Sequence, residues 1–497
     1  MIPESSVEET VLAVEESSVQ DEAPSQPGTS TALDERQRPR NWPRTRKWTT
    51  TVVLSAVAFL QPMGETALAP AEQAVSAALG IEHDYQWMLL NGLILVGLGA
   101  SSVILAPLSE AYGRKPVLVA GTLSFVLWNT AAGATSSLDA MLALRLLSGM
   151  GASVGDSVAG GVLSDLWLAG DRGRAYGVFT AAPTFGTAVA PICGAYVSHA
   201  AGWRWIFWLT SLASGVTIVA TWLFLPETYE PAIARRLRRA AEKRTDDGPA
   251  DPGPSRHATR FVNEVLPNLQ RPFRMLGTQV IVQLLSVYMA LLYGLLWLFL
   301  FIYPKMWAEV YHQDARTGSL NYLSFGTGLL VGANVGGQIN DRIYARLKTR
   351  NSGVGRPEFR VPGMVVGTFL APAGLLLWGW SGEAALHWAV PNVGSFVFAL
   401  GIYICSTCVS VYTIDTYTLY AASAISTNLV LRSISGGLFP LFAPYMFDSL
   451  GFGLSATVLA VSFIALGTSV TAVLWFYGER LRARSPYCAA DSDESDS

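Results

Sequence analysis

The sequence predicts an all-α integral membrane protein with twelve transmembrane helices. Composition is the first reason, because 51% of the 497 residues are hydrophobic and only 14% are charged, whereas soluble domains average about 25% charged residues. The second reason is that the apolar residues form segments close to the roughly 20 residues that a membrane-spanning helix needs. We expect spans near residues 48–69, 86–107, 117–134, 138–163, 174–197, 204–225, 276–302, 317–339, 361–380, 388–412, 417–445 and 454–477.

The basic residues are distributed unevenly among the connections between these spans. Of the 34 lysines and arginines, only Arg204, Lys305 and Arg316 fall in connections predicted to lie outside. Cytoplasmic loops carry an excess of lysine and arginine, and an even number of spans places both chain ends on one side. We therefore expect a multi-pass protein with both termini in the cytoplasm.

A long polar connection between the sixth and seventh spans divides the chain into two halves. We predict a disordered cytoplasmic tail over 1–40, six-helix bundles over 41–226 and 275–479, a cytoplasmic linker over 227–274 and an acidic cytoplasmic tail over 480–497. The linker contains the basic run from Arg235 to Arg239. This run either binds anionic lipid beside the membrane or only enforces the topology, and both interpretations stay open.

A short charged segment separates the second and third spans. Gly113 and Pro116 interrupt helices on either side of Arg114 and Lys115, and this basic pair favours the cytoplasmic face. The segment resembles the signature between helices 2 and 3 of major facilitator transporters, in the form found in fungal drug exporters. The matching residues are Pro107, Leu108, Ser109, Glu110, Tyr112, Gly113, Arg114, Lys115 and Pro116. The segment departs from the broader superfamily pattern at Ala111.

The resemblance covers about residues 41–480 and implies the major facilitator fold. In that fold two six-helix bundles rock around a central cavity. It also implies that Gly113 permits a tight turn and that Arg114 forms charge pairs that set the balance between conformations. A second acidic–basic stretch, Gly336 to Arg342, follows the eighth span and is expected to be the corresponding loop of the second half.

Arg145 is predicted to lie inside the fourth span, four residues before Gly149. A charge inside the bilayer costs about 2.5 kcal/mol or more unless it is paired or hydrated. The pair resembles a second facilitator signature that is associated with proton coupling. The alternative is an arginine near the interface whose side chain extends to water.

Two carboxylates are also predicted to lie within spans. Asp156 follows Arg145 in the fourth span, and Glu65 lies in the first span between Pro62 and Pro70. Burial penalises the charged form of a carboxyl group, so each could take up and release a proton. Asp156 could instead pair with a basic residue that the sequence does not reveal, and Glu65 could lie at an outer mouth exposed to water.

The fifth span carries prolines and glycines that bend a helix and allow close packing. These residues are Pro183, Gly186, Pro191 and Gly194. The pattern resembles the signature typical of facilitator antiporters, although Thr187 and Ala190 replace a proline and a glycine of that signature. The resemblance therefore favours exchange over symport.

The tenth and eleventh spans contribute two further charged candidates. Asp415 and Arg432 match the exporter family and could either serve a substrate or proton site or form a structural pair. With Arg145, Asp156 and Glu65 they complete the predicted set of coupling and substrate residues.

The predicted function is export of a small organic molecule (a drug, toxin or polyamine) in exchange for protons. The sequence contains neither a Gly-x-x-x-x-Gly-Lys phosphate loop nor a His-Glu-x-x-His zinc motif. We therefore expect no enzyme activity, no cofactor, no metal and no nucleic-acid partner. We also expect a monomer in the plasma membrane, with the vacuolar membrane as an alternative. A nutrient facilitator or symporter, or a sensor that kept the fold without transport, remain alternatives.

Overall fold

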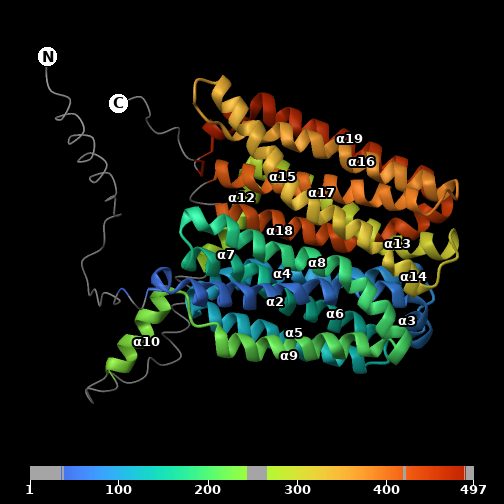
Figure 1. Ribbon diagram of the computed structural model, residues 1–497, viewed down its shortest axis with the longest axis horizontal. Coiled ribbons are helices and arrows are strands. Elements are labelled where there is room, and N and C mark those ends of the chain that lie inside the picture. Colours follow the sequence, from blue (N-terminus) through green and yellow to red (C-terminus); the bar gives the residue numbers. More distant parts are fainter. Residues whose placement is uncertain (1–34, 36–37, 243–265, 418–420, 486, 489–497) are drawn as a thin grey trace.

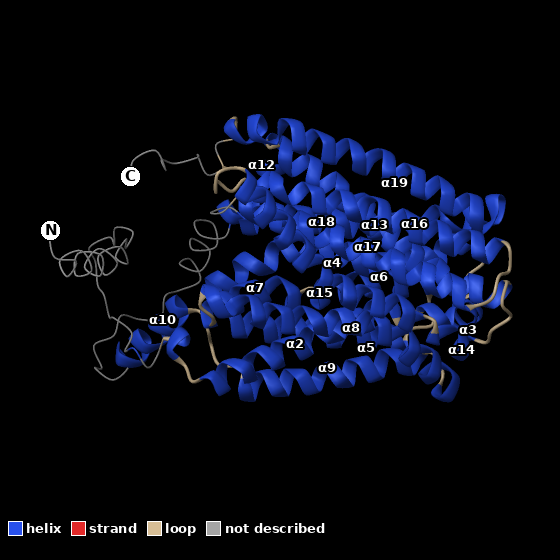
Figure 2. Ribbon diagram, turned by 45° about the horizontal axis from the view of Figure 1, so that its top comes forward, coloured by secondary structure: helices blue, strands red, loops and turns tan. Residues whose placement is uncertain are grey.

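The computed structural model describes residues 35, 38–242, 266–417, 421–485 and 487–488. Every regular element in these ranges is a helix, which confirms the predicted all-α class. Figure 2 shows the long helices side by side with their axes roughly aligned, and the loops lie mainly at the helix ends. The predictions for the N-terminal and acidic C-terminal tails fall mostly outside the described residues, as does the middle of the predicted linker.

The N-terminal bundle contains the long helices that cross the membrane and several short ones. The long helices are α2 (Arg44–Thr66), α4 (Asp84–Tyr112), α5 (Arg114–Ala134), α6 (Leu138–Ala152), α7 (Val154–Leu166), α8 (Ala169–Ala201) and α9 (Arg204–Phe224). The short ones are η2 (Pro39–Asn41), η3 (Ala69–Ala71) and α3 (Glu72–Leu79).

The C-terminal bundle follows two helices of the linker region, α10 (Glu230–Glu242) and α12 (Leu266–Thr278). Its long helices are α13 (Val280–Glu309), α15 (Tyr322–Arg350), α16 (Val361–Glu383), α17 (Ala389–Thr416), α18 (Ala421–Leu438) and α19 (Ala443–Ala483). The short helices are α14 (Ala315–Leu320), η5 (Pro357–Arg360) and η7 (Phe439–Phe442).

Ten segments of the described chain are long and apolar enough to cross a membrane. The longest, Ser423–Ala483, covers α19 and all of α18 after its first two residues. α15 is not among the ten, because asparagine, aspartate and arginine between Asn334 and Arg342 make it more polar. It nevertheless packs against α17 of its own bundle and against α8 of the N-terminal bundle. Counting α15, α18 and α19 separately gives the predicted twelve spans.

The connection between the second and third spans is shorter than predicted. α4 continues through Pro107 to Tyr112 and α5 begins at Arg114, so the expected charged loop is reduced to Gly113. Gly113 has a φ of 108°, which glycine adopts readily because it lacks a Cβ atom. In the second half the corresponding stretch is not a loop, because α15 continues to Arg350 and the next positive-φ glycine is Gly353.

Two further spans differ from the prediction. The fourth span is divided at Ser153 into α6 and α7, and the Ser153 hydroxyl is hydrogen-bonded to that of Ser101 in α4 (2.6 Å). The hydrogen bond from the Ser153 N–H to the Gly149 carbonyl oxygen is long, at 3.4 Å. The backbone hydrogen bonding of the helix is therefore weakened at this point. The eleventh span ends at Leu438, and Gly451, with a φ of 76°, breaks α19.

We call the two ends of the molecule the α10 end and the α3 end, after the short helices that lie there (Figure 1). The halves meet where α18 packs on α4 and α15 packs on α8. A Cβ atom on Gly92 would lie 2.1 Å from the Gly437 carbonyl oxygen, and one on Gly326 would lie 2.0 Å from the Ala188 Cβ. Since α4 begins at the α3 end, the halves are closely packed toward that end.

Candidate functional site

The structure brings four of the five predicted coupling residues together. Glu65 of α2 interacts electrostatically with Asp156 of α7, with Arg145 of α6 and with Arg432 of α18. Arg432 belongs to the C-terminal bundle and the other three belong to the N-terminal bundle. The charges therefore meet across the boundary between the halves.

Arg145 is fully buried, with 1% of its surface exposed, so the alternative of a side chain extending to water is wrong. Its Nη1 donates to the Gly64 carbonyl oxygen at 2.7 Å, and its Nε donates to that of Leu90 at 3.2 Å. The guanidinium carbon lies 5.9 Å from the centre of the Phe207 ring. Arg145 thus joins α6 to α2 and α4, and its positive charge lies beside the residue that follows Gly64.

That residue is Glu65, whose side chain is 4% exposed. The outer-mouth alternative is therefore wrong in this conformation. Gln61, one turn earlier on α2, donates from Nε2 to Glu65 Oε1 at 3.0 Å. Gln61 also interacts with Asp156, so this amide lies between the two carboxylates. Gln61 was not among the predicted residues, although a polar residue one turn before an intramembrane glutamate is a usable sequence signal.

Asp156 is half-buried, and the cation with which it interacts is Arg432 of the other half. No basic side chain of the described residues lies within ion-pair distance of it, so the interaction acts through space. Arg432 Nη1 donates to the Tyr293 hydroxyl at 3.1 Å, and its guanidinium carbon lies 4.4 Å from the centre of that ring. Tyr293 in turn is 3.4 Å from the Ser406 hydroxyl of α17.

Tyrosines add further polar groups to this charged cluster between the halves. Tyr176 of α8 is 52% exposed and interacts electrostatically with Asp156, Tyr403, Tyr293 and Arg432. Tyr176 lies on the part of α8 nearer the α10 end, whereas the packing of the halves is tight toward the α3 end. The charged site is therefore reached from the α10 end in this conformation.

Asp415 lies elsewhere. Arg360 Nε donates to Asp415 Oδ2 at 3.0 Å, and Arg360 Nη1 donates to Asp341 Oδ1 at 2.7 Å. An Asp415–Arg432 pair is therefore wrong. Asp415 is near the end of α17, twelve residues beyond Tyr403, which corresponds to roughly 18 Å along a helix at about 1.5 Å per residue.

A matching charge network surrounds Arg114 in the first half. Arg114 Nε donates to Asp165 Oδ2 at 3.3 Å, Nη1 donates to Ser109 Oγ at 2.6 Å, and Nη2 lies 3.8 Å from Glu110 Oε1. The glutamate of α4, the arginine of α5 and the aspartate of α7 thus correspond to Asp341, Arg360 and Asp415. This correspondence supports the internal repeat, although α15 continues to Arg350 where α4 ends at Tyr112 before the Gly113 turn.

Glu227 closes the network from the segment after α9. Its carboxylate accepts the backbone N–H of Arg114 at 2.9 Å and that of Lys115 at 3.3 Å. A Cβ atom on Gly113 would lie 2.5 Å from Glu227 Oε2. Asp165 and Glu227 were not among the predicted site residues, because their roles depend on packing between distant helices.

The antiporter-type residues of α8 pack against α2. Pro183 and Pro191 lie inside a continuous helix. A Cβ atom on Gly186 would lie 2.8 Å from the Phe59 carbonyl oxygen, and one on Gly194 would lie 1.7 Å from that of Ala67. The two glycines therefore permit a close approach of the α8 and α2 backbones.

Replacing Gly194 with alanine should lower the free energy of unfolding in detergent by about 1–3 kcal/mol, because the added methyl group overpacks the contact with α2. Gly177 on the same helix has nothing within 4 Å of its Cβ position. Gly177→Ala is therefore the control and should keep or slightly raise stability, since alanine favours helix by about 1 kcal/mol. Equal losses in both variants, measured by thermal unfolding, would contradict the packing argument.

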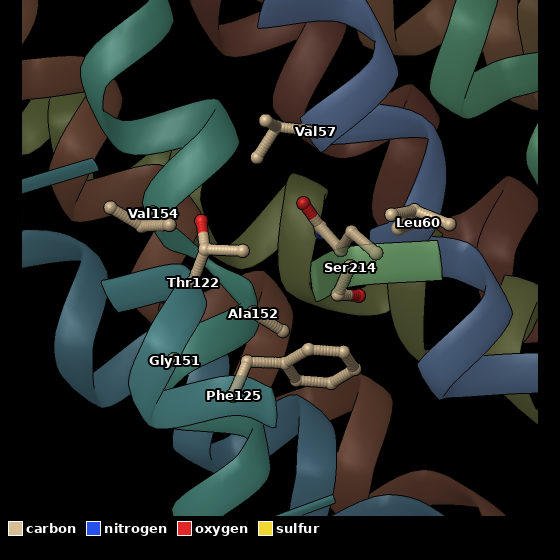
Figure 3. Close-up of a pocket in the computed structure, with 9 residues that line it drawn as sticks. Val57, Leu60, Thr122, Phe125, Gly151, Ala152, Val154 and Ser214 are labelled. Carbon is tan, nitrogen blue, oxygen red and sulfur yellow. The ribbon is translucent and has the colours of Figure 1, made fainter. Parts of the chain in front are cut away.

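A small pocket lies within the N-terminal bundle, between α2, α5, α9 and the α6–α7 break (Figure 3). Val57, Leu60, Phe125 and Ser214 surround it, and Gln61 also lines it. The pocket thus reaches the amide that contacts Glu65. The lining is mainly apolar, and Gln61 is the lining residue that also contacts Glu65 of the charged site.

Comparison with known proteins decides the family, because the family model of the Major Facilitator Superfamily matches residues 54–440. The chain belongs to the major facilitator superfamily. It is 34% identical over 453 residues to the efflux pump vrtL of Penicillium aethiopicum, covering 91% of this chain and 90% of that protein. It is 36% identical over 451 residues to the uncharacterized transporter C1529.01 of Schizosaccharomyces pombe, covering 90% of this chain and 91% of that protein.

The fold is shared with a solved facilitator structure. The xylose transporter XylE of E. coli, in a partially occluded inward open conformation, superposes with a TM-score of 0.63 at 13% identity. The match covers 86% of this chain and 98% of XylE. The major facilitator fold with two six-helix bundles is thereby confirmed, and the protein is a multi-pass membrane transporter rather than an enzyme.

Proposed function

We propose that this facilitator exports a small organic molecule in exchange for protons. The observation that carries the proposal is the meeting of Glu65 and Asp156 with Arg432 across the boundary between the halves. Relatives that are efflux pumps support the direction of transport. The antiporter-type glycines of α8 support exchange.

Asp156 is our first choice for the coupling carboxylate. It is half-buried and so reachable by a proton from the central space, and its cationic neighbour Arg432 sits on the opposite half. When the halves rock apart on one side, this interaction changes, and proton affinity changes with it. Protonation on one side and release on the other then becomes linked to the conformation.

Glu65 is our second choice for the coupling carboxylate, and Arg145 is assigned as the cation that modulates its charge. Arg145 interacts electrostatically with Glu65, while Gln61 carries the connection from Glu65 to Asp156. Asp415 is assigned instead to the charge network at the α10 end. There Arg114 and Arg360 link helices within their own halves and favour one arrangement of each bundle.

We infer a plasma-membrane protein with the α10 end in the cytoplasm, since the basic connections lie there. The arrangement described here is then inward-facing. We further propose that residues 41–226 and 275–479 move as the two halves of a monomer. The substrate is a drug, toxin, other secondary metabolite or polyamine.

The direct test compares cells with and without this gene, by mass spectrometry of medium and cell extracts and by growth on toxic compounds. Export predicts compounds that are depleted from the medium and enriched in the cells when the gene is deleted. A nutrient importer predicts the reverse distribution. If the protein is a sensor without transport, the purified protein in sealed vesicles should transport none of these compounds.

A further inference from the structure

An apolar groove runs along the outside of the N-terminal bundle between α5 and α9. It has a volume of about 750 Å³, within the range of small-molecule sites. Val126, Leu212, Val216, Leu223 and Phe224 are among its lining residues. Leu212 is 67% exposed and Leu223 is 58% exposed, so the groove opens outward from the bundle. Since both helices cross the membrane, this opening faces the hydrocarbon of the bilayer.

Positive charge is concentrated where the groove reaches the α10 end. Lys115 Nζ donates to the Trp222 carbonyl oxygen at 2.7 Å, which places the ammonium group beside the groove residues Leu223 and Phe224. Arg236 of α10 is exposed and close enough to Lys115 for the two charges to repel each other. Glu227 attracts Lys115 electrostatically, but its carboxylate accepts the backbone N–H groups of Arg114 and Lys115, and no carboxylate of the described residues forms an ion pair with either cation. Two cations beside one carboxylate leave a net positive charge that favours binding of an anion.

We propose that this groove binds an anionic glycerophospholipid of the leaflet at the α10 end. The phosphate and the acidic headgroup lie between Lys115 and Arg236, and an acyl chain fills the groove between α5 and α9. A lipid is the occupant that fits because the apolar surface and the paired cations are continuous and meet at the depth of the membrane surface. Each cation near such a surface contributes about a factor of five in affinity.

The site also touches the charge network described above. The backbone N–H of Lys115 donates to Glu227, whose carboxylate also holds Arg114. A headgroup on the Lys115 side chain therefore contacts the segment that joins α4, α5 and α9. We expect lipid occupancy to influence the balance between the two conformations.

The test measures phosphatidylserine binding to the purified full chain by native mass spectrometry, with phosphatidylcholine as the reference lipid. Lys115→Gln/Arg236→Gln should weaken phosphatidylserine binding by roughly thirtyfold, since two charges of about 1 kcal/mol each are lost. Arg236→Gln alone, on the exposed face of α10, should weaken phosphatidylserine binding about fivefold. The matched control is Arg346→Gln/Arg350→Gln, which removes two exposed cations from the end of α15.

A second variant tests the groove independently of charge. Gly215 lines the groove and has nothing within 4 Å of its Cβ position, so Gly215→Phe can fill the space without disturbing the bundle. It should weaken binding of both lipids, whereas Leu209→Phe, on the same helix outside the groove, should not. The proposal is overturned if the double variant binds phosphatidylserine like its control, or if glycerophosphoserine without acyl chains competes equally well. It is also overturned if Gly215→Phe converts a dimer to a monomer, because the groove is then an interface between copies.

Discussion

Replacing Gly113 with valine should abolish transport while leaving the protein in the membrane. Two effects act together at this position. A side chain at a φ of 108° and a ψ of 154° is strained, by about 1–3 kcal/mol, and the new Cβ atom would lie 2.5 Å from Glu227 Oε2. The carboxylate must then leave the N–H groups of Arg114 and Lys115, which disconnects the segment after α9 from the start of α5.

Gly202 offers a matched control for the strain alone. It ends α8 with a φ of 92° and a ψ of 158°, close to the 108° and 154° of Gly113, yet nothing lies within 4 Å of its Cβ position. Gly202→Val should therefore retain most transport activity at equal surface abundance. Equal loss in both variants would mean that strain, and not the contact with Glu227, explains the requirement for Gly113.

Arg114→Ala should produce the same transport defect through the charge network. Removing the guanidinium leaves Asp165 without its arginine partner and Ser109 without its donor. Breaking one partner of a buried pair typically costs about 3–5 kcal/mol, and here the loss falls on the contacts between α4, α5 and α7. Membrane localisation by microscopy and export of the identified substrate are the two measurements. Normal export by both Gly113→Val and Arg114→Ala would contradict the assigned role of this motif.

Asp156→Asn should retain substrate binding but lose the acceleration of efflux by an imposed proton gradient. The amide keeps the size and polarity of the carboxyl group but cannot carry a proton. A gradient of one pH unit is worth about 1.4 kcal/mol, or tenfold in accumulation per exchanged proton. The wild type should follow this factor, whereas the variant should show the same flux with and without the gradient.

Glu65→Gln distinguishes the two carboxylates. If Asp156→Asn keeps wild-type proton dependence and Glu65→Gln loses it, coupling belongs to Glu65. Gln61→Leu adds a control for the link between them, because it removes the amide that donates to Glu65 at 3.0 Å while both carboxylates remain. We expect it to weaken, and not to abolish, proton dependence.

The sequence was sufficient for the fold because its signals are local. Apolar length indicates most spans, and the segment from Pro107 to Pro116 resembles the family signature that the match over residues 54–440 confirms. The positions of helix ends were less predictable, since α4 continues to Tyr112 and α15 to Arg350, beyond the ends of the predicted apolar spans. Only the backbone of Gly113, with its positive φ, reveals that the connection is a turn of one residue.

The candidate site was predictable in its residue types but not in its pairings. A buried arginine and two intramembrane carboxylates stand out in any apolar span. That Arg145 donates to the Gly64 carbonyl oxygen, and that Asp156 interacts with Arg432, depends on contacts between helices far apart in the chain. The break at Ser153 likewise requires the Ser101 hydroxyl of another helix. Such contacts leave no periodic signal in a single sequence.

The most direct test of proton-coupled export is proton movement in inside-out membrane vesicles that hold an acidic lumen, monitored with a pH-sensitive dye. The substrate is the compound identified by comparing cells with and without the gene. The account predicts that adding this compound releases protons from the lumen of wild-type vesicles while the compound accumulates inside, and that Asp156→Asn vesicles release none. Accumulation to the same level without any proton release, with or without the gradient, would contradict it.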